Sequence, residues 1–599
     1  MKTKIIIISK GQYLSDILTE LPANAVILKT ATGIGATTLE ILCDRNSLII
    51  EPNVPVIRGK KRKGILGIYE GVDVPMIMDY LMNESFKYKK ILVTPESFHK
   101  VIEAADNLNI NLLSDYFLLF DECDRTMKDI SYRDTIIKPM EIFFAFKNKA
   151  FISATAVVPS DPRFEAHKFK KVIIKPDYDY QQAIEIITTN NVTQTFRNVV
   201  NDLDSECVCI FYNSLQGIIN MINELGIADQ SNIYCSSNKS TELSINGING
   251  VYDNITPIYA KYNWFTSRFF SALDIPMDLK PTVIMVTNVY LAHHTMIDPK
   301  SDAVQIVGRF RNGVDEVIAI SNFDSSIKTK SPDEAVSYLE GCEETYNTIK
   351  ALHTGASNPG AKATLTEALE LVKYSAFVNE DGTRNHYRYD NFFYEETIKF
   401  LYVQPEALLE GYNTPHFLPN TSSQTHLLFD NDIKATTYGL PYRELTNQLI
   451  SVLNRLESES DLKYVIDNKQ LVIDQLERNY PDIVRGYYEL GATQLSSNSY
   501  SKKQLKIALR DKRETEQKSD FAFVQSLYDV FDDGYEASTK KLLDKLGFVI
   551  TKHKLDLKPT VSLLKEFFNL GPRKTIKGGE EQKGYKILST KFNRKTGQN

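Results

Sequence analysis

Short apolar runs alternate with longer amphipathic stretches through residues 1–325 of the chain. Short runs rich in β-branched side chains are typical of strands that are buried on both faces of a sheet. The intervals between the runs leave room for crossover helices, which favours parallel sheets. The first series of predicted strands covers residues 25–29, 47–51, 90–94, 117–121 and 150–153. After a connector at residues 176–180, the second series covers residues 183–188, 207–212, 232–235, 281–287 and 316–321.

Beyond residue 331 helical periodicity replaces this alternation. The helical patterns cover residues 332–353, 363–373 and 442–518. The Asp381-Gly382 pair within residues 377–389 favours a hairpin turn, whereas residues 414–424 have the composition of a loop. The sequence therefore predicts an α/β fold with two tandem parallel-sheet lobes, followed by a mainly α-helical C-terminal region.

Composition and charge limit the functions that this architecture can have. Hydrophobic residues make up 42% and charged residues 24% of the chain, which are values of a globular protein. The formal net charge of −6 excludes a protein that coats nucleic acid by bulk positive charge, but not one that grips it locally. Residues 571–599 hold eight basic and two acidic side chains, which is a local net charge of +6. The net charge of residues 1–570 is therefore −12.

These changes in hydrophobic pattern and charge along the sequence divide the chain into four expected parts. We expect lobes at residues 1–175 and 176–328, a helical accessory region at 329–530, and a small basic module or tail at 531–599. In the last part, helical patterns at 538–546 and 560–568 precede the apolar run at 586–588. Two alternatives stay open there, a winged-helix-like nucleic-acid module and a solvated basic tail.

The six cysteines are too scattered for a disulfide framework. Cys207 and Cys209 lie two residues apart in an apolar run, so we expect both to be buried thiols on one face of a strand. The four isoleucines near the N-terminus are too short a run for a signal peptide, and no stretch approaches the ~20 apolar residues of a membrane span. We therefore expect a soluble protein of the bacterial or host-cell cytoplasm, with no membrane partner.

A glycine-rich turn follows the first predicted strand, with the sequence Thr30-Ala-Thr-Gly-Ile-Gly-Ala-Thr-Thr38. Such a strand-to-helix turn cradles phosphate with its backbone N–H groups and the helix N-terminus. Gly33 and Gly35 allow close approach of the backbone, and Thr37 or Thr38 could place a hydroxyl on Mg²⁺. Taken alone, the motif is equally compatible with an ordinary structural turn.

Three further motifs suit the hydrolysis of a nucleoside triphosphate. In the strand end Leu-Leu-Phe-Asp121-Glu122-Cys-Asp, Asp121 can hold Mg²⁺, and Glu122 can orient or deprotonate the attacking water. The run Phe-Ile-Ser-Ala-Thr155 ends another strand. In Gln305-Ile-Val-Gly-Arg-Phe-Arg311, an arginine pair can stabilise charge on a transferring phosphoryl group. Each motif alone also fits an ordinary strand end or a solvated helix start.

The order of these motifs resembles that of the superfamily 2 helicase-like NTPases of the DEAD/DEAH-box type. G-x-G-x-T-T, D-E-x-D, S-A-T and Q-x-x-G-R-x-R follow one another within residues 1–325, just over half of the chain. The resemblance implies that ATP and Mg²⁺ bind between two RecA-like lobes and that nucleic acid crosses both lobes. It implies nucleic-acid backbone contacts for Pro52, Asn53, Thr94, Pro95, Glu96, Ser97, Asn213, Ser214, Thr266 and Ser267.

The same resemblance assigns roles around the nucleotide. Asp121 and Glu122 would carry the hydrolysis. The lobes would be coupled by Ser153, Ala154 and Thr155. From the second lobe, ATP would be reached by Gln305, Arg309 and Arg311, and Asp274 would link nucleotide to nucleic acid. The phosphates and Mg²⁺ would be held by Thr32, Gly33, Gly35, Ala36, Thr37 and Thr38.

The sequence departs from the family pattern at Ala36, where the phosphate loop normally carries a lysine. That lysine is a point charge on the β- and γ-phosphates, so its loss removes a contact worth roughly 1.5–3 kcal/mol. Either the protein binds ATP without hydrolysing it, or another cation substitutes, for which Lys29 is the candidate. Arg311 follows Arg309 by two residues instead of the usual three, so Arg309 matches the pattern better, and Ala272 stands where glycine is common.

The favoured function is an ATP-dependent nucleic-acid helicase or translocase in replication, recombination or repair; DNA is favoured as the substrate, although the sequence does not distinguish DNA from RNA. The alternative is a catalytically impaired, helicase-like scaffold that binds nucleic acid. A motor coupled to defence or restriction is disfavoured because the sequence has no nuclease signature. The missing lysine and the unfamiliar C-terminal half favour a divergent lineage, such as a virus or mobile element.

Overall fold

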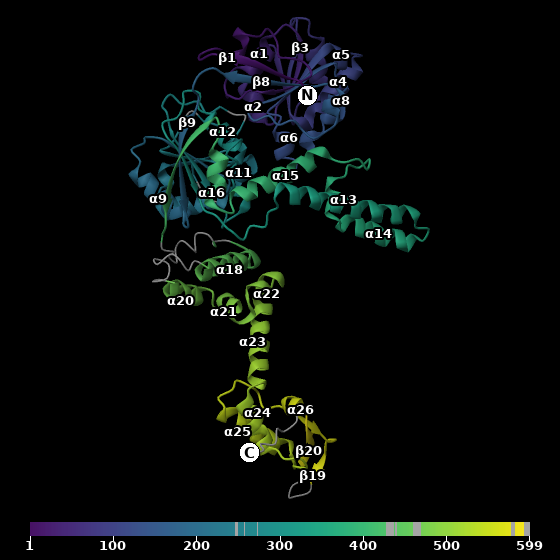
Figure 1. Cartoon of the computed structure of the whole chain (residues 1–599), viewed down its shortest axis with the longest axis vertical. Helices are drawn as coiled ribbons and strands as arrows, with labels where there is room; N and C mark the ends of the chain where they lie inside the picture. The colour runs from purple at the N-terminus through teal and green to yellow at the C-terminus, as the bar shows by residue number, and fades with distance from the viewer. Residues whose placement is uncertain are drawn as a thin grey trace. The chain divides into compact units, whose positions relative to one another are not determined.

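The computed structural model separates the chain into two compact units, Met1–Thr436 and Thr437–Asn599 (Figure 1). It describes residues 1–245, 249–256, 258–271, 274–426, 437, 440–458, 469–576 and 582–591. Ala272 and the basic residues at 577, 594 and 595 lie outside the described residues.

An all-parallel sheet of eight strands forms the first lobe, in the order β1-β8-β2-β7-β6-β3-β5-β4. Its strands are β1 (Thr3–Ile8), β2 (Ala25–Leu28), β3 (Asn46–Ile50), β4 (Ile65–Ile68), β5 (Lys90–Val93), β6 (Tyr116–Asp121), β7 (Asn148–Ser153) and β8 (Lys170–Pro176). Its helices are α1 (Ala36–Leu42), α2 (Val54–Gly59), α3 (Val74–Met82), α4 (Phe98–Asn107), α5 (Leu112–Asp115), α6 (Arg125–Lys128), α7 (Met140–Phe143) and α8 (Arg163–Ala166).

The central strands of this sheet are buried on both faces. Leu48 and Ile50 of β3 pack into one apolar cluster with Val101 of α4. Ile49, between them, packs into a second cluster with Leu39 of α1. Because successive side chains of a strand point to opposite faces, helices must cover both faces, as in a doubly wound α/β lobe.

A second all-parallel sheet of eight strands follows, in the order β12-β11-β13-β10-β14-β15-β9-β16. Its strands are β9 (Gln182–Thr189), β10 (Val208–Tyr212), β11 (Ser231–Tyr234), β12 (Val251–Tyr252), β13 (Tyr262–Phe265), β14 (Thr282–Thr287), β15 (Val317–Ser321) and β16 (Phe417–Gln424). Its helices are α9 (Val192–Asp202), α10 (Leu215–Leu225), α11 (Ser237–Ile245) and α12 (Asp302–Val307). Cys207 and Cys209 are both buried here, as predicted.

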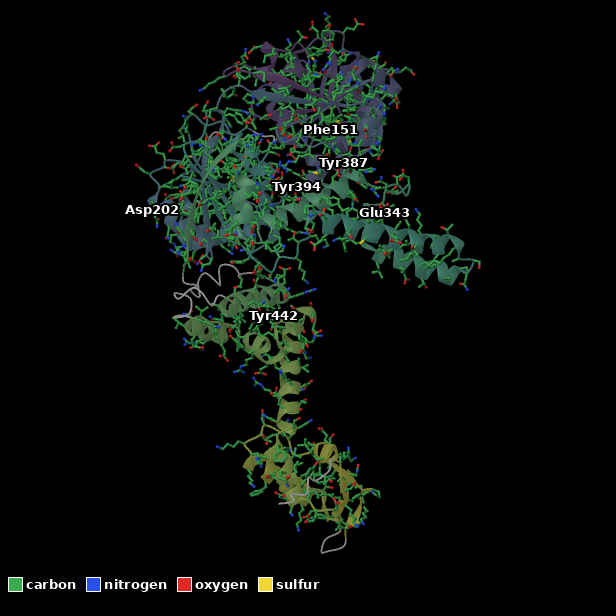
Figure 2. All side chains as sticks on the ribbon, in the orientation of Figure 1. Phe151, Asp202, Glu343, Tyr387, Tyr394 and Tyr442 are labelled. Carbon is green, nitrogen blue, oxygen red and sulfur yellow. The ribbon has the colours of Figure 1, made fainter. Side chains whose placement is uncertain are left out.

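Four helices extend from the second lobe: α13 (Pro332–Gly355), α14 (Pro359–Leu371), α15 (His386–Leu401) and α16 (Pro405–Tyr412). A capping box at Ser331 and Glu334 starts α13. Tyr387 of α15 packs into the core of the first lobe, and the Lys128 ammonium of α6 lies over the ring of Tyr394 (Figure 2). Thus α15 is anchored to the first lobe by aromatic side chains on its surface.

The second unit begins with the helices α18 (Tyr442–Ser458), α20 (Lys469–Asn479), α21 (Pro481–Leu490), α22 (Ala492–Ser497) and α23 (Lys502–Lys518). A small module follows, made of α24 (Phe521–Val530), β17 (Glu536–Ser538), α25 (Thr539–Lys552), α26 (Val561–Phe567), β18 (Phe568–Leu570), β19 (Lys574–Ile576) and β20 (Gln582–Thr590). Antiparallel β20 pairs with β17, β18 and β19, and its Ile587 lies in the module's core. Residues 582–590 therefore form a strand of a small α/β module; whether this module is winged-helix-like in function stays a prediction.

The predicted fold class is confirmed: two tandem RecA-like parallel-sheet lobes precede a mainly helical region. Two local predictions were wrong. Residues 417–424 are not a loop, because β16 pairs in parallel with β9 at the edge of the second sheet. An edge strand needs few apolar residues, which is why its polar sequence resembled a loop. The predicted hairpin at 377–389 is reduced to one bridge between Val378 and Arg384, because Asn385 caps and starts α15.

The attachment of β16 can be tested with neighbouring substitutions. Phe417 is buried against the ring of Tyr412, at a centroid distance of 5.7 Å, whereas Leu418 is half exposed. Phe417→Ala should lower the free energy of unfolding of the second lobe by about 3–5 kcal/mol. Leu418→Ala should stay within about 0.5 kcal/mol of wild type. Urea denaturation followed by the fluorescence of Trp264, the single tryptophan and a buried residue of β13, reports this lobe; equal effects would contradict the pairing.

Candidate nucleotide site

The glycine-rich turn joins β2 to α1, and three of its residues have left-handed backbone conformations. The φ angles are 56° at Thr30, 73° at Gly33 and 80° at Gly35. A Cβ atom on Gly33 would collide with the guanidinium group of Arg311 from the second lobe. Both glycines are therefore required, one of them also by its close contact across the lobes.

Asp121 ends β6, next to this turn. Because β2, β7, β6 and β3 are neighbours in a parallel sheet, their carboxyl ends lie at one edge. The Thr37 hydroxyl donates a hydrogen bond to Asp121 Oδ2, whereas Thr38 is exposed. Of the two threonines predicted for Mg²⁺, the structure brings Thr37 to the carboxylate.

Glu122 receives contacts from three segments of the chain. Its Oε1 lies 3.1 Å from Lys29 Nζ, and its Oε2 lies 3.0 Å from Ser153 Oγ and 2.9 Å from Gln305 Nε2 of α12. Its φ of 48° is a left-handed conformation that a non-glycine residue adopts at a cost of about 1–3 kcal/mol. The buried carboxylate thus joins the two lobes.

The S-A-T motif is bonded to the acidic motif. Ser153 Oγ lies 2.7 Å from Asp124 Oδ1, and Thr155 Oγ1 donates to Asp124 Oδ2 at 2.9 Å. Ala154 is buried between them. The motif therefore contacts two of the three carboxylates of the D-E-x-D sequence, Glu122 and Asp124.

The two arginines of the second lobe have different surroundings. Arg309 is buried, and its Nη2 donates to Gln305 Oε1 at 2.6 Å. Arg311 is partly exposed, lies over Gly33 and pairs with Asp274 at 2.5 Å. The backbone of Gly308 rests against Thr32 of the phosphate loop. Arg311 is thus the arginine at the phosphate loop, although Arg309 matches the sequence pattern better.

Lys29 lies between the two acidic side chains. Its Nζ is 3.4 Å from Asp121 Oδ1 and 3.1 Å from Glu122 Oε1. Burial acts to lower the pKa of this ammonium, but Asp121 and Glu122 outweigh it and hold the pKa above its usual value. Burial acts to raise the pKa of Asp121, but Lys29 and Lys60 hold it well below its usual range.

Sequence reasoning missed a second lysine at this site. Lys60, which directly follows α2, has its Nζ 2.8 Å from Glu51 Oε1 and 3.4 Å from Asp121 Oδ2. Glu51 follows β3 and is fully buried, and its Oε2 has no hydrogen-bond partner. A glutamate directly after an apolar strand was the available signal, since a buried charge requires a partner.

The residues predicted to contact nucleic acid are largely engaged within the protein. Glu96 forms two bonds to Arg133, at 2.7 and 2.8 Å, and Arg133 Nη1 also donates to the carbonyl of Pro52. Ser214 caps α10, and Asn213 bridges His294 O and Ser267 N. Side chains are buried at Pro52, Thr94, Pro95, Ser97 and Ser214, and half-buried at Asn53, Asn213, Thr266 and Ser267. Their contact with nucleic acid stays a prediction.

The arrangement fits a nucleotide with Mg²⁺. Within the described ranges, no group of three His, Cys, Asp or Glu side chains is arranged to hold a metal alone. Mg²⁺ commonly takes one or two protein ligands and the oxygens of phosphates and water. Thr37 and Asp121 would be those ligands, with the left-handed glycines cradling the phosphates. In the part of the chain that the structure describes, no helix is both long and apolar enough to cross a bilayer.

The buried Glu51 generates a pH prediction. Burial raises its pKa to about 7, against the opposing effect of Lys60, from an ordinary value of 4.5. Between pH 4.5 and 7 the Glu51 carboxyl is deprotonated in the unfolded chain but still protonated in the folded chain. The free energy of unfolding therefore falls as pH rises through this range. Relative to Glu51→Gln, wild type should lose up to about 3 kcal/mol between pH 4.5 and 7.

Urea denaturation at several pH values measures this difference. Glu103→Gln, which changes an exposed glutamate of α4, is the matched control and should run parallel to wild type. Parallel curves for Glu51→Gln and wild type would contradict the prediction.

Neither a family model nor a curated protein matches this sequence. Among solved structures, the chain is similar to S. cerevisiae Dbp5 bound to RNA and ADP BeF3, with 14% identity, a TM-score of 0.34, and coverage of 50% of this chain and 79% of that one. A DEAD box protein from the hyperthermophile Methanococcus jannaschii shows 17% identity, a TM-score of 0.29, and coverage of 50% and 82%. RecG bound to a three-way DNA junction shows 11% identity, a TM-score of 0.31, and coverage of 64% and 48%. The two-lobe architecture of this chain is therefore defined by its own strand order, in two all-parallel sheets of eight strands.

Proposed function

We propose that this chain is an ATP-dependent nucleic-acid helicase or translocase. The observation that carries the proposal is Glu122, a buried carboxylate that accepts from Ser153 in the first lobe and Gln305 in the second. A catalytic carboxylate shared in this way makes hydrolysis depend on how the lobes are placed. Such dependence is what a motor needs to convert ATP turnover into movement.

Each side chain of the site has a role in this proposal. Thr37 and Asp121 would hold Mg²⁺, which supplies charge stabilisation on the β- and γ-phosphates. Glu122 orients or deprotonates the attacking water, within the network that Ser153 and Gln305 fix. Arg311, over the phosphate loop, stabilises charge that develops on the transferring phosphoryl group.

The small C-terminal module supports DNA over RNA as the substrate. Its helices α25 and α26 are packed together, exposed Lys558 lies just before α26, and exposed Lys565 lies on it. The second helix of such a pair can enter the major groove of B-DNA, whereas the A-form groove is too deep and narrow.

The six cysteines are unpaired, which suits the reducing cytoplasm. Replication, recombination or repair, in a virus or mobile element, would use such an activity.

A second candidate function is a scaffold that binds nucleic acid without turning over ATP. Ala36 favours it, because the phosphate loop carries no charged side chain at that position. The ammonium groups of Lys29 and Lys60 on Asp121 also favour it, because they compete with Mg²⁺ for the carboxylate. ATP turnover distinguishes the two functions.

We expect the full chain to hydrolyse ATP, faster with single-stranded DNA than with RNA of the same sequence. Glu122→Gln should lower kcat by about 100-fold or more, because the water loses its base. Glu103→Gln, on the exposed face of α4, should leave kcat unchanged. Steady-state phosphate release measures these rates, and unwinding of a tailed duplex then separates a helicase from a translocase. If no nucleic acid elicits turnover, the motor is excluded and the scaffold remains.

The adjacent threonines provide a test of the metal ligand. Thr37→Ala should raise the Mg²⁺ concentration for half-maximal ATP turnover by roughly 10–100-fold, because Mg²⁺ would lose one proposed ligand and Asp121 would lose its hydroxyl partner. Thr38→Ala, which changes an exposed neighbour in the same helix, should behave as wild type. A Mg²⁺ titration of both variants gives the comparison. A larger effect at Thr38 would exclude the assignment of Thr37.

A further inference from the structure

The phosphate loop lacks a positive charge of its own. Ala36 occupies the first turn of α1, where a lysine would otherwise reach the terminal phosphates of ATP. Two other lysines, Lys29 and Lys60, lie on Asp121, which is also bonded to Thr37 of the loop. Their surroundings distinguish which of them can serve a phosphate.

Lys29 forms ion pairs with two carboxylates of the protein itself. It contacts Asp121 on Oδ1 and Glu122 on Oε1, and its side chain is only 10% exposed. Moving its ammonium to a phosphate would leave two adjacent buried carboxylates without their shared counterion. Breaking a buried pair in this way is strongly unfavourable.

Lys60 approaches the same acid from the other side. The sheet order is β2-β7-β6-β3, so Lys29 comes from the β2 side of Asp121 and Lys60 from the β3 side. Lys60 lies 3.4 Å from Asp121 Oδ2, the oxygen that also accepts from Thr37 at the start of α1. Its side chain is 30% exposed against 10% for Lys29, so Lys60 is the more open of the two lysines to an anion.

Glu51 holds Lys60 in this position. The carboxylate is fully buried, lies 2.8 Å from Lys60 Nζ through Oε1, and has no hydrogen-bond partner on Oε2. Burying the Glu51 carboxylate with one oxygen unbonded costs free energy. The bond from its other oxygen fixes the end of the long, flexible Lys60 side chain. Such a contact is suited to presenting the ammonium toward the loop.

We propose that Lys60 supplies the charge that the phosphate loop lacks, with its ammonium contacting the terminal phosphates of bound ATP and Glu51 acting as its positioning residue. Lys29 remains the counterion of Asp121 and Glu122. The proposal rests on the proposed function to the extent that it requires ATP to bind in this loop. It replaces Lys29, the candidate from sequence, with a residue from a different strand–helix unit.

Equilibrium binding of fluorescently labelled ATP, ADP and AMP, with Mg²⁺ and the full chain, tests the proposal. Lys60→Ala should weaken ATP binding by about 10- to 100-fold and ADP binding less, because a charge-assisted contact is lost at the terminal phosphates. AMP binding should not change. Lys61→Ala, which changes an exposed lysine in the same basic run, should bind all three as wild type does.

Two further variants separate positioning from folding. Lys60→Arg should recover part of the preference for ATP over AMP, because it keeps the charge. Lys60→Met keeps the apolar stem and should show the same phosphate-dependent loss as Lys60→Ala. Glu51→Gln should reduce the preference for ATP without abolishing it. The far-ultraviolet circular dichroism spectrum and the unfolding temperature of the full chain verify that each variant is folded.

The outcomes are distinguishable. Unchanged ATP binding by Lys60→Ala, or an equal loss of ATP, ADP and AMP, overturns the role of Lys60 and leaves the proposed function in place. A phosphate-dependent loss in Lys29→Ala but not in Lys60→Ala assigns the substitution to Lys29 and also overturns it. Failure of wild type to bind any of the three nucleotides excludes the proposed function and this inference together.

Discussion

A buried carboxylate at the end of β6 is the constraint on which the site depends. An ionised side chain as buried as Asp121 costs several kcal/mol unless charges and hydrogen bonds compensate it. The compensation comes from Lys29, Lys60, Thr37 and the backbone N–H of Glu122. Lys29 follows β2, Lys60 follows α2, Thr37 lies in the first turn of α1 and Glu122 follows β6, so the order of strands in the first sheet brings these groups together.

The second lobe is coupled to this acid through the next residue. Glu122 accepts from Gln305, and Gln305 in turn accepts from Arg309, so a buried polar chain runs from β6 into the second lobe. Separating the lobes would remove the hydrogen bond that Gln305 donates to Glu122. Lobe placement and the environment of the Glu122 carboxylate are therefore coupled, and under the proposed function a bound nucleotide would shift both together.

The sequence predicted those parts of the fold and site that depend on local pattern. Central strands such as β6 were predictable because burial on both faces demands a continuous apolar run, and Thr37, Asp121 and Glu122 were predictable from motif spacing. The edge strand β16 was not, because half-exposed strands tolerate polar residues. Lys60 was not, because its contact with Asp121 depends on β3 lying beside β6, which no spacing in the sequence encodes.

The edge strand β16 also connects the second lobe to the glycine-rich turn of the first lobe. His416, directly before β16, lies with its Nε2 2.8 Å from the carbonyl of Thr30, so this nitrogen must donate. Burial lowers the pKa of His416, which favours the neutral ring with the proton on that nitrogen. Thr30 has a left-handed backbone that costs about 1–3 kcal/mol, and the contact helps to hold it. Because β16 belongs to the second sheet, this contact links the conformation of the phosphate loop at Thr30 to the second lobe. Arg311 of the second lobe provides another such link at Gly33. The second lobe thus contacts the loop at Thr30, Thr32 and Gly33, and all three contacts must change if the lobes separate.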